Sequence, residues 1–175
     1  FKGTFEVLKE TSLTAASLFA VLIGAWIFSN FVNLAGLPEA LRAAVTAYDV
    51  PPWVVMGMII LIYIALGCVF ESLSMLLLTV PIFFPLVMSL DFNMDPTEVA
   101  IWFGIIVVVV TEISLITPPV GLNVFILKGV VGDVKTSTVF RGVTPFWVMD
   151  IVRLILLLAI PTLVLVLPSH MTFSH

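Results

Sequence analysis

The sequence predicts an all-α integral membrane protein that combines transmembrane helices with a re-entrant helical hairpin and a broken helix. Of its 175 residues, 61% are hydrophobic and only 10% are charged, whereas a soluble domain carries about 25% charged residues. Long apolar segments alternate with short polar connections, as expected for helices that cross a bilayer. One of these segments, residues 113–127, contains no charge but holds two prolines and a glycine at its centre.

Composition also excludes several functional classes. The 11 Asp and Glu residues outnumber the 7 Lys and Arg residues, so no nucleic-acid surface is indicated. Cys68 is the only cysteine, which rules out an internal disulfide and a thiolate metal cluster. The sequence offers no nucleophile–base pair, histidine cluster or phosphate loop, so an enzyme is not indicated and no organic cofactor is expected. Because the sequence begins at Phe1 and not at Met, we expect a fragment of a longer chain.

The first 34 residues predict two helical segments. Residues 1–12 mix Lys and Glu with the apolar Phe5 and Leu8, a pattern typical of an amphipathic helix at the membrane surface. Residues 13–34 carry no charge and are long enough to span a bilayer. We expect a polar loop to follow, from Gly36 to the Pro51-Pro52 pair.

Residues 53–90 form two apolar arms on either side of Glu71, and we expect a re-entrant hairpin with its tip near residues 67–74. At 1.5 Å per residue the first arm is only about 21 Å long. The hydrocarbon core is about 30 Å thick, so in a hairpin Glu71 would lie inside the protein near the midplane. Two full spans remain an alternative, since they too return the chain to the side where it entered.

Residues 102–127 predict a transmembrane helix that is broken at its centre. Pro118 and Pro119 remove two backbone donors, and Gly121 permits dihedrals that other residues avoid. In lipid, such a break is tolerated only where protein buries it or where it lines a polar cavity. Because transporters use the freed carbonyls to bind ions or substrates, the break is a candidate site. The alternative is a proline kink that serves packing alone.

Polar groups at membrane depth supply the other candidate residues. Thr117, Asn123 and the freed carbonyls offer oxygen ligands, which hard cations prefer. Glu112 lies about 16 Å along its helix, near the midplane, where a carboxyl is either functional or fixes helix packing. At the hairpin tip, Glu71 and Ser72 either contact a ligand or cap the next helix.

Residues 145–167 predict the final span, after a basic loop over residues 128–144. Within it, Asp150 and Arg153 are three residues apart, so we expect them to pair at the membrane border. If residues 53–90 return, Arg42 lies alone on one side, and the other basic residues outside the span share the opposite side: Lys2, Lys9, Lys128, Lys135 and Arg141. The positive-inside rule then places that basic side in the cytoplasm and the C-terminus outside, in the periplasm.

Four motifs are distinctive: Gly67-Cys-Val-Phe-Glu-Ser, Leu78-Thr-Val-Pro-Ile-Phe-Phe-Pro-Leu, Trp102-Phe-Gly-Ile and Leu115-Ile-Thr-Pro-Pro-Val-Gly-Leu-Asn-Val-Phe. With them the chain resembles the large membrane subunit of tripartite ATP-independent periplasmic (TRAP) transporters. The Thr-Pro-Pro-Val-Gly-Leu-Asn run is quite specific in this order. The resemblance covers nearly the whole chain and is to the C-terminal half of that subunit.

This resemblance implies a sodium-coupled secondary transporter that imports organic acids, often carboxylates, across the bacterial inner membrane. It implies two inverted repeats that work by an elevator motion, of which the chain would be one, without the N-terminal half of the same subunit. A periplasmic substrate-binding protein and a small membrane subunit would be its partners. The competing hypotheses are a dicarboxylate or citrate symporter that works without a binding protein, and a structural membrane subunit.

The resemblance also implies sodium sites between the hairpin tip and the break. Gly67 would serve at the tip, and Ser114, Thr117 and Val120 would serve at the break, mostly through backbone oxygens. Residues expected to contact substrate or shape the site are Glu71, Ser72, Glu112, Pro118, Pro119, Gly121 and Asn123. The chain departs from the family at three places: it has Ser114 where Gly is usual, Glu71 where Asp is common, and a longer loop over residues 91–102.

Overall fold

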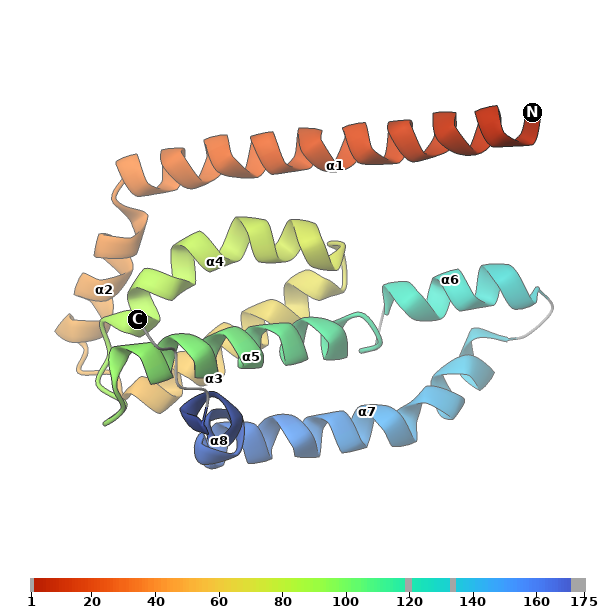
Figure 1. Cartoon of the computed structure of the whole chain (residues 1–175). Coiled ribbons are helices and arrows are strands. Elements are labelled where there is room, and N and C mark those ends of the chain that lie inside the picture. Colours follow the sequence, from red (N-terminus) through yellow and green to blue (C-terminus); the bar gives the residue numbers. More distant parts are fainter. Residues whose placement is uncertain (1, 119–120, 133–134, 171–175) are drawn as a thin grey trace.

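A computed structural model describes residues 2–118, 121–132 and 135–170, and these ranges contain helices and no strands (Figure 1). The hairpin and the broken helix lie at the centre of the arrangement, and the remaining helices flank them. In chain order the helices are α1 (Lys2–Leu34), α2 (Leu37–Ala47), α3 (Pro52–Gly67), α4 (Ser72–Met88), α5 (Pro96–Ser114), α6 (Leu122–Val131), α7 (Thr136–Ala159) and α8 (Thr162–His170).

Helix α1 is continuous, which differs from the expected division into a surface helix over residues 1–12 and a span over residues 13–34. The polar residues at the expected junction do not interrupt it, because their hydroxyls bond to carbonyls one turn earlier. Ser12 donates to the Leu8 carbonyl at 2.8 Å, and Thr14 donates to the Glu10 carbonyl at 2.9 Å. Where α1 meets a membrane surface stays a prediction.

Residues 37–47 form helix α2 where the sequence predicted a loop. Gly36 adopts a left-handed conformation with φ of 70°, which lets the chain turn sharply after α1. Pro38 then lies in the first turn of α2, where its missing N–H costs nothing because first-turn donors have no partner within a helix. Pro38 is therefore compatible with the start of a helix inside the stretch that was expected to be a loop.

Helices α3 and α4 form an antiparallel hairpin with residues 68–71 as its tip. The hairpin turns back near the interruption between α5 and α6, well short of the far end of α1 (Figure 1). Its arms are tied at mid-length by the hydroxyls of Tyr63 and Thr79, which lie 2.6 Å apart. Since Thr79 donates to the Met75 carbonyl at 2.7 Å, Tyr63 is the donor to Thr79. Both side chains are buried, so this bond satisfies two hydroxyls in an apolar setting.

Helix α5 begins at Pro96 and not at Trp102, because local polar contacts start it early. The Glu98 carboxylate accepts a hydrogen bond from the Asp95 backbone N–H at 3.1 Å, and Pro96 takes the first helical position. The helix ends at Ser114, and α6 starts at Leu122. The interruption falls on the stretch whose prolines and glycine predicted a break.

The last span differs from the expected residues 145–167, since α7 runs from Thr136 to Ala159 and α8 follows a bend at Ile160-Pro161. Pro145 lies inside α7 instead of starting it. Pro161 cannot donate to the carbonyl of Leu157, four residues earlier, so the helix stops there. That carbonyl instead accepts the indole N–H of Trp102 at 2.9 Å. The freed acceptor is thus satisfied from α5.

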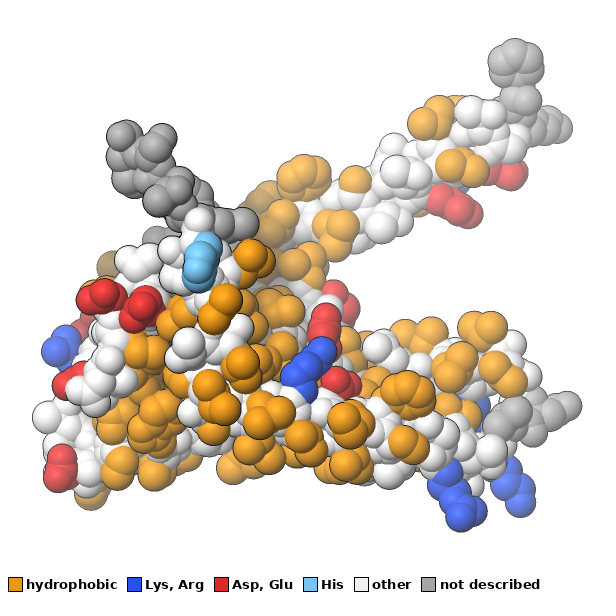
Figure 2. Space-filling view, turned by 60° about the horizontal axis from the view of Figure 1, so that its bottom comes forward, with side chains coloured by type: hydrophobic (Ala, Val, Ile, Leu, Met, Phe, Trp, Pro, Cys, Tyr) orange, Lys and Arg blue, Asp and Glu red, His pale blue; other side chains and the backbone are white. Residues whose placement is uncertain are grey.

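The buried core lies mainly among α3, α4 and α5, with Tyr63, Val87, Trp102 and Ile113 fully enclosed. By contrast, α1 and α7 expose much apolar surface, and hydrophobic side chains cover most of the face in Figure 2. Helices α1, α5 and α7 are long and apolar enough to cross a membrane. Such an all-α chain, apolar outside as well as inside, is a multi-pass membrane protein.

The two ends of the molecule differ in charge. The start of α1 and the connection from α6 to α7 lie at one end, whereas α2 and the connection from α4 to α5 lie at the other (Figure 1). Most Lys and Arg side chains in Figure 2 gather at the end where α6 and α7 meet. The segments that carry Lys2, Lys9, Lys128, Lys135 and Arg141 thus share one end of the molecule. Helix α2, which carries Arg42, lies at the other end.

This arrangement predicts the outcome of a labelling experiment. In a complete subunit otherwise free of cysteine, Asp95→Cys should react with a membrane-impermeant maleimide on intact cells. Lys135→Cys should react only after the membrane is permeabilised, because the positive-inside rule predicts that the basic end faces the cytoplasm. Labelling of intact cells at position 135 but not at position 95 would show the opposite orientation.

Candidate functional site

The hairpin tip packs directly against the last turn of α5. Gly67, the last residue of α3, and Ser114, the last residue of α5, are both buried. A Cβ atom added at Gly67 would overlap the Ser114 side chain, so only glycine allows this approach. The structure thus brings together two residues that the resemblance assigned to one ion site.

Glu71 caps helix α4 and holds the tip in shape. Its Oε1 accepts the Leu73 backbone N–H at 2.9 Å, and its Oε2 accepts the Ser74 backbone N–H at 3.1 Å. The Ser74 hydroxyl donates to Oε2 at 3.0 Å, and the Ser72 hydroxyl lies 3.4 Å from Oε1. A carboxylate at this position satisfies orphan amides and complements the positive end of the helix. Every bond that the structure gives Glu71 is therefore local to the tip.

Hydroxyl groups close the end of α5. Ser114 donates its hydroxyl to the Thr111 carbonyl at 2.6 Å, and Thr117 donates to the Ile113 carbonyl at 2.7 Å. The Thr117 backbone N–H donates to the Ser114 carbonyl at 3.2 Å. These bonds add partners to carbonyls in the last turn of the helix, where the usual intrahelical donors are missing.

The chain crosses the break in a compact path. The Asn123 backbone N–H donates to the Leu115 carbonyl at 3.1 Å, which ties α6 to the end of α5. Gly121 precedes α6 with φ of 55°, and a Cβ there would meet the Ile116 backbone at 3.4 Å. The Asn123 side chain and Pro118 are exposed, whereas the predicted residues Pro119 and Val120 lie outside the described residues.

Two carbonyls at the break keep free acceptor capacity. Among the described residues, no donor reaches the carbonyls of Ile116 and Thr117. On α5, the buried Thr111 hydroxyl likewise has no partner within the described part of the chain. Unpartnered oxygens in an apolar setting are costly unless a ligand, water or ion satisfies them. The end of α5 therefore offers oxygen ligands of the kind that a hard cation prefers.

Trp147 on α7 contacts the break, although no sequence pattern pointed to it. Its indole N–H donates to the Thr117 hydroxyl oxygen at 2.9 Å. The available signal was chemical: a tryptophan well inside an apolar helix needs an acceptor for its N–H. The sequence does not say which acceptor that is, because thirty residues separate Trp147 from Thr117.

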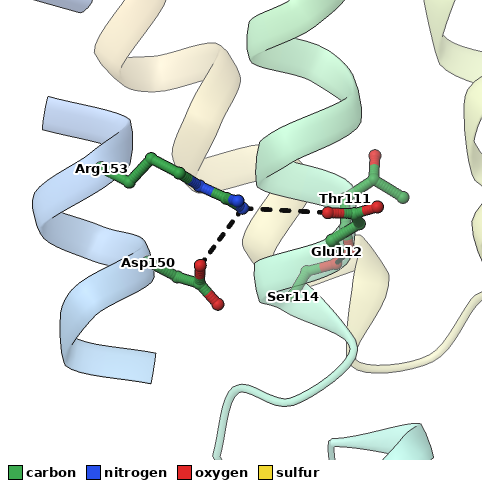
Figure 3. Close-up of polar contacts among 5 residues, drawn as sticks. All are labelled: Thr111, Glu112, Ser114, Asp150 and Arg153. Carbon is green, nitrogen blue, oxygen red and sulfur yellow. Dashed lines mark hydrogen bonds and ion pairs between the residues drawn. The ribbon is translucent and has the colours of Figure 1, made fainter. Parts of the chain in front are cut away.

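A second polar cluster lies on the other side of α5 (Figure 3). Arg153 approaches Asp150 at 3.2 Å on its own helix, the pair that the sequence predicted, and Glu112 on α5 at 3.8 Å. Two residues along a helix correspond to a rotation of about 200°, so Glu112 and Ser114 face opposite sides. Glu112 points toward Arg153 in Figure 3. The structure therefore does not bring Glu112 to the contact between tip and break.

Known proteins similar to the chain agree on one family. The family model described as the tripartite ATP-independent periplasmic transporter, DctM component, matches residues 1–163. The C4-dicarboxylate TRAP transporter large permease protein DctM of Pseudomonas aeruginosa is 32% identical over 97% of the chain and 38% of its own length. The sialic acid TRAP transporter large permease protein SiaM of Vibrio cholerae is 32% identical over 96% of the chain and 38% of its own length.

A more distant relative is the isethionate TRAP transporter permease protein DctMQ of Oleidesulfovibrio alaskensis. It is 26% identical over 91% of the chain, which corresponds to 24% of that protein. The chain thus spans well under half the length of these curated relatives. No solved structure matches the chain.

The contact between Gly67 and Ser114 predicts that a substitution at position 67 destabilises the protein and that a second substitution at position 114 restores stability. Gly67→Ala should lower the free energy of unfolding by about 1–3 kcal/mol, because the added methyl group overpacks a filled contact. Ser114→Gly should recover much of that loss in the double variant by removing the opposing side chain. Gly57→Ala is the control, since a Cβ at Gly57 on the same helix meets nothing within 4 Å. Thermal unfolding of the complete subunit in detergent measures all four proteins, and equal effects at positions 57 and 67 would contradict the contact.

The local bonds of Glu71 predict that its shape matters more than its charge. Glu71→Gln keeps the size and one acceptor oxygen, so folding and most sodium activation of uptake should remain. Glu71→Leu leaves the amides of α4 without a cap and should lower stability by about 0.5–2 kcal/mol, with loss of uptake. If Gln abolishes sodium activation as fully as Leu does, the charge itself binds the ion and the capping account is wrong.

Proposed function

The chain belongs to the DctM-component family of tripartite ATP-independent periplasmic transporters, and we propose that it forms part of a sodium-coupled pathway for import of an organic acid. Because the chain corresponds to 38% of the length of its dicarboxylate and sialic acid relatives, transport is an activity of the complete subunit. The role proposed for the chain itself is to bind the coupling ion and to contribute one wall of the substrate site.

The observation that carries this proposal is the contact of the hairpin tip with the end of α5. Glycine at position 67 brings the tip backbone against Ser114, where the helix has just ended. The carbonyls of Ile116 and Thr117 follow within three residues, and no donor among the described residues reaches them. Sodium is a hard cation that oxygen ligands bind, and broken helices supply such ligands in secondary transporters.

The substrate class follows from the relatives together with the polar groups near the tip. The names of the relatives refer to C4-dicarboxylates, sialic acid and isethionate, which are all organic anions. Helix α6 starts beside the break, and the positive end of a helix favours an anion. Ser72 and the exposed Asn123 side chain offer hydrogen bonds on the tip and on α6. Pro118 and Gly121 lie between the end of α5 and the start of α6, where the chain turns.

The proposed assembly has three further components. The remainder of the same subunit supplies the other half of the substrate site, a periplasmic substrate-binding protein delivers the acid, and a small membrane subunit braces the large one. We place the complex in the bacterial inner membrane with the C-terminus of this chain in the periplasm, since the basic end belongs inside. The proposal is for transport and not for catalysis, with sodium as the only bound ion.

The test is reconstitution of the complete subunit, with its small subunit and its binding protein, in sealed liposomes. Uptake of labelled C4-dicarboxylate, sialic acid and isethionate is measured under an inward sodium gradient and under an equal potassium gradient. We expect one of these anions to accumulate only with sodium and only with the binding protein. Accumulation without the binding protein would instead identify an independent symporter, and equal uptake in potassium would refute sodium coupling.

In the same liposomes, Thr117→Val should raise the sodium concentration that gives half-maximal uptake. The substitution removes the hydroxyl that fixes the residue between α5 and the prolines, and so disturbs the adjacent carbonyls. Thr46→Val is the matched control, because the Thr46 hydroxyl makes the same kind of bond to the Arg42 carbonyl, at 3.0 Å, on the distant helix α2. Unchanged sodium activation of the Thr117 variant at normal expression would contradict this role.

A further inference from the structure

We propose that Trp147 is a positioning residue for the ion site: its indole N–H holds Thr117, and through it the carbonyls at the break, in the arrangement that binds the coupling ion. The inference rests on the proposed function and adds to it a residue on a different helix. Trp147 lies on α7 and does not itself contact the ion.

The hydrogen bonds of Thr117 fix it from three directions. A threonine hydroxyl has one proton to donate and two lone pairs that accept. The proton goes to the Ile113 carbonyl at 2.7 Å, and one lone pair accepts the Trp147 N–H at 2.9 Å. The backbone N–H donates to the Ser114 carbonyl at 3.2 Å. Of these three bonds, only the one from Trp147 comes from outside the turn that ends α5.

Position 117 determines how the chain leaves α5. The residue before a proline is restricted to extended backbone conformations by the proline ring, and Thr117 precedes Pro118. The direction in which its carbonyl points therefore depends on the hydrogen bonds that orient Thr117. Thr117 is buried, with 7% of the residue exposed, so solvent has little access to its hydroxyl. Loss of the Trp147 bond would leave Thr117 held only by bonds within the turn that ends α5.

Packing alone does not fix the indole. A cavity of about 120 Å³ lies beside the ring and is lined by Ile116, Pro118, Phe140, Val143, Thr144 and Trp147. A side chain with empty space on one side is held by contacts on its other faces and by its hydrogen bonds. Here the bond to Thr117 is the directional contact. It aligns the ring with the break, and it is the bond that a phenylalanine cannot make.

Trp102 provides a matched comparison within the same pair of helices. Its indole N–H also joins α5 to α7, through the Leu157 carbonyl at 2.9 Å. It lies in the first half of α5, whereas the break follows the end of that helix. Removing either indole N–H therefore weakens the contact between α5 and α7, but only one removal touches the break.

The experiment compares Trp147→Phe with Trp102→Phe in the complete transporter in liposomes. Sodium is varied at saturating substrate, and thermal unfolding is measured in parallel. We expect Trp147→Phe to raise the sodium concentration for half-maximal uptake by about three- to ten-fold, as the loss of one hydrogen bond predicts, with little change in the maximal rate. Trp102→Phe should lower the unfolding temperature at least as much and leave the sodium dependence unchanged. Trp147→His, which keeps a ring N–H, should recover part of the sodium response.

The outcomes separate this inference from the proposed function. If wild-type uptake depends on sodium but Trp147→Phe leaves that dependence unchanged, or if both phenylalanine variants shift it equally, Trp147 is not a positioning residue. If the wild type responds to another cation instead, sodium coupling fails, and the same titration with that cation still tests Trp147. If Trp147→Phe does not fold, the histidine variant decides: a sodium response that is weakened only in part supports the positioning role, and a wild-type or a fully lost response in a folded protein overturns it.

Discussion

The structure depends on one constraint: a helix that is broken in an apolar setting leaves backbone groups that need partners. The chain meets it at the break between α5 and α6 with short-range bonds from hydroxyls and amides. Ser114 and Thr117 close the last turn of α5, and the Asn123 N–H reaches back to Leu115. The carbonyls that remain form the candidate site, so satisfying the backbone and binding an ion are parts of one problem.

The same constraint explains how α7 is held against the core. Little of α7 is buried, so apolar packing within the described chain does not hold it firmly. Instead three polar contacts join it to α5 and the break, from Trp147, Arg153 and Leu157. Hydrogen bonds between membrane helices are modest individually, at about 0.6 kcal/mol on average. Spread along α7, however, they fix its rotation and register relative to α5, which apolar contacts alone specify poorly.

The parts of the fold that sequence predicted are those with strong local signals. Two prolines and a glycine predicted the break, and the apolar arms around Glu71 predicted an antiparallel pair of helices, whose re-entrant placement in the membrane stays a prediction. Helix boundaries were less predictable because proline is ambiguous: Pro38 and Pro96 start helices, Pro145 lies within one, and Pro161 follows the end of one. The charged start of α1 suggested a separate surface helix. Charge pattern, however, says nothing about whether the backbone continues as one helix, which it does here.

The candidate site shows the same division between local and distant causes. Glu71 as a cap could be inferred from Ser72 and Ser74 beside it, whereas the donor to Thr117 lies on a helix whose register no local pattern reveals. Gly67 and Ser114 show that the residue allowed at one position depends on the residue at the position it contacts. Their approach leaves room for one side chain, which here belongs to position 114. With glycine at both positions the backbones could come closer, so the serine side chain occupies space that tighter packing would otherwise use. In the proposed ion site, the room beside the tip is therefore set by the two positions together.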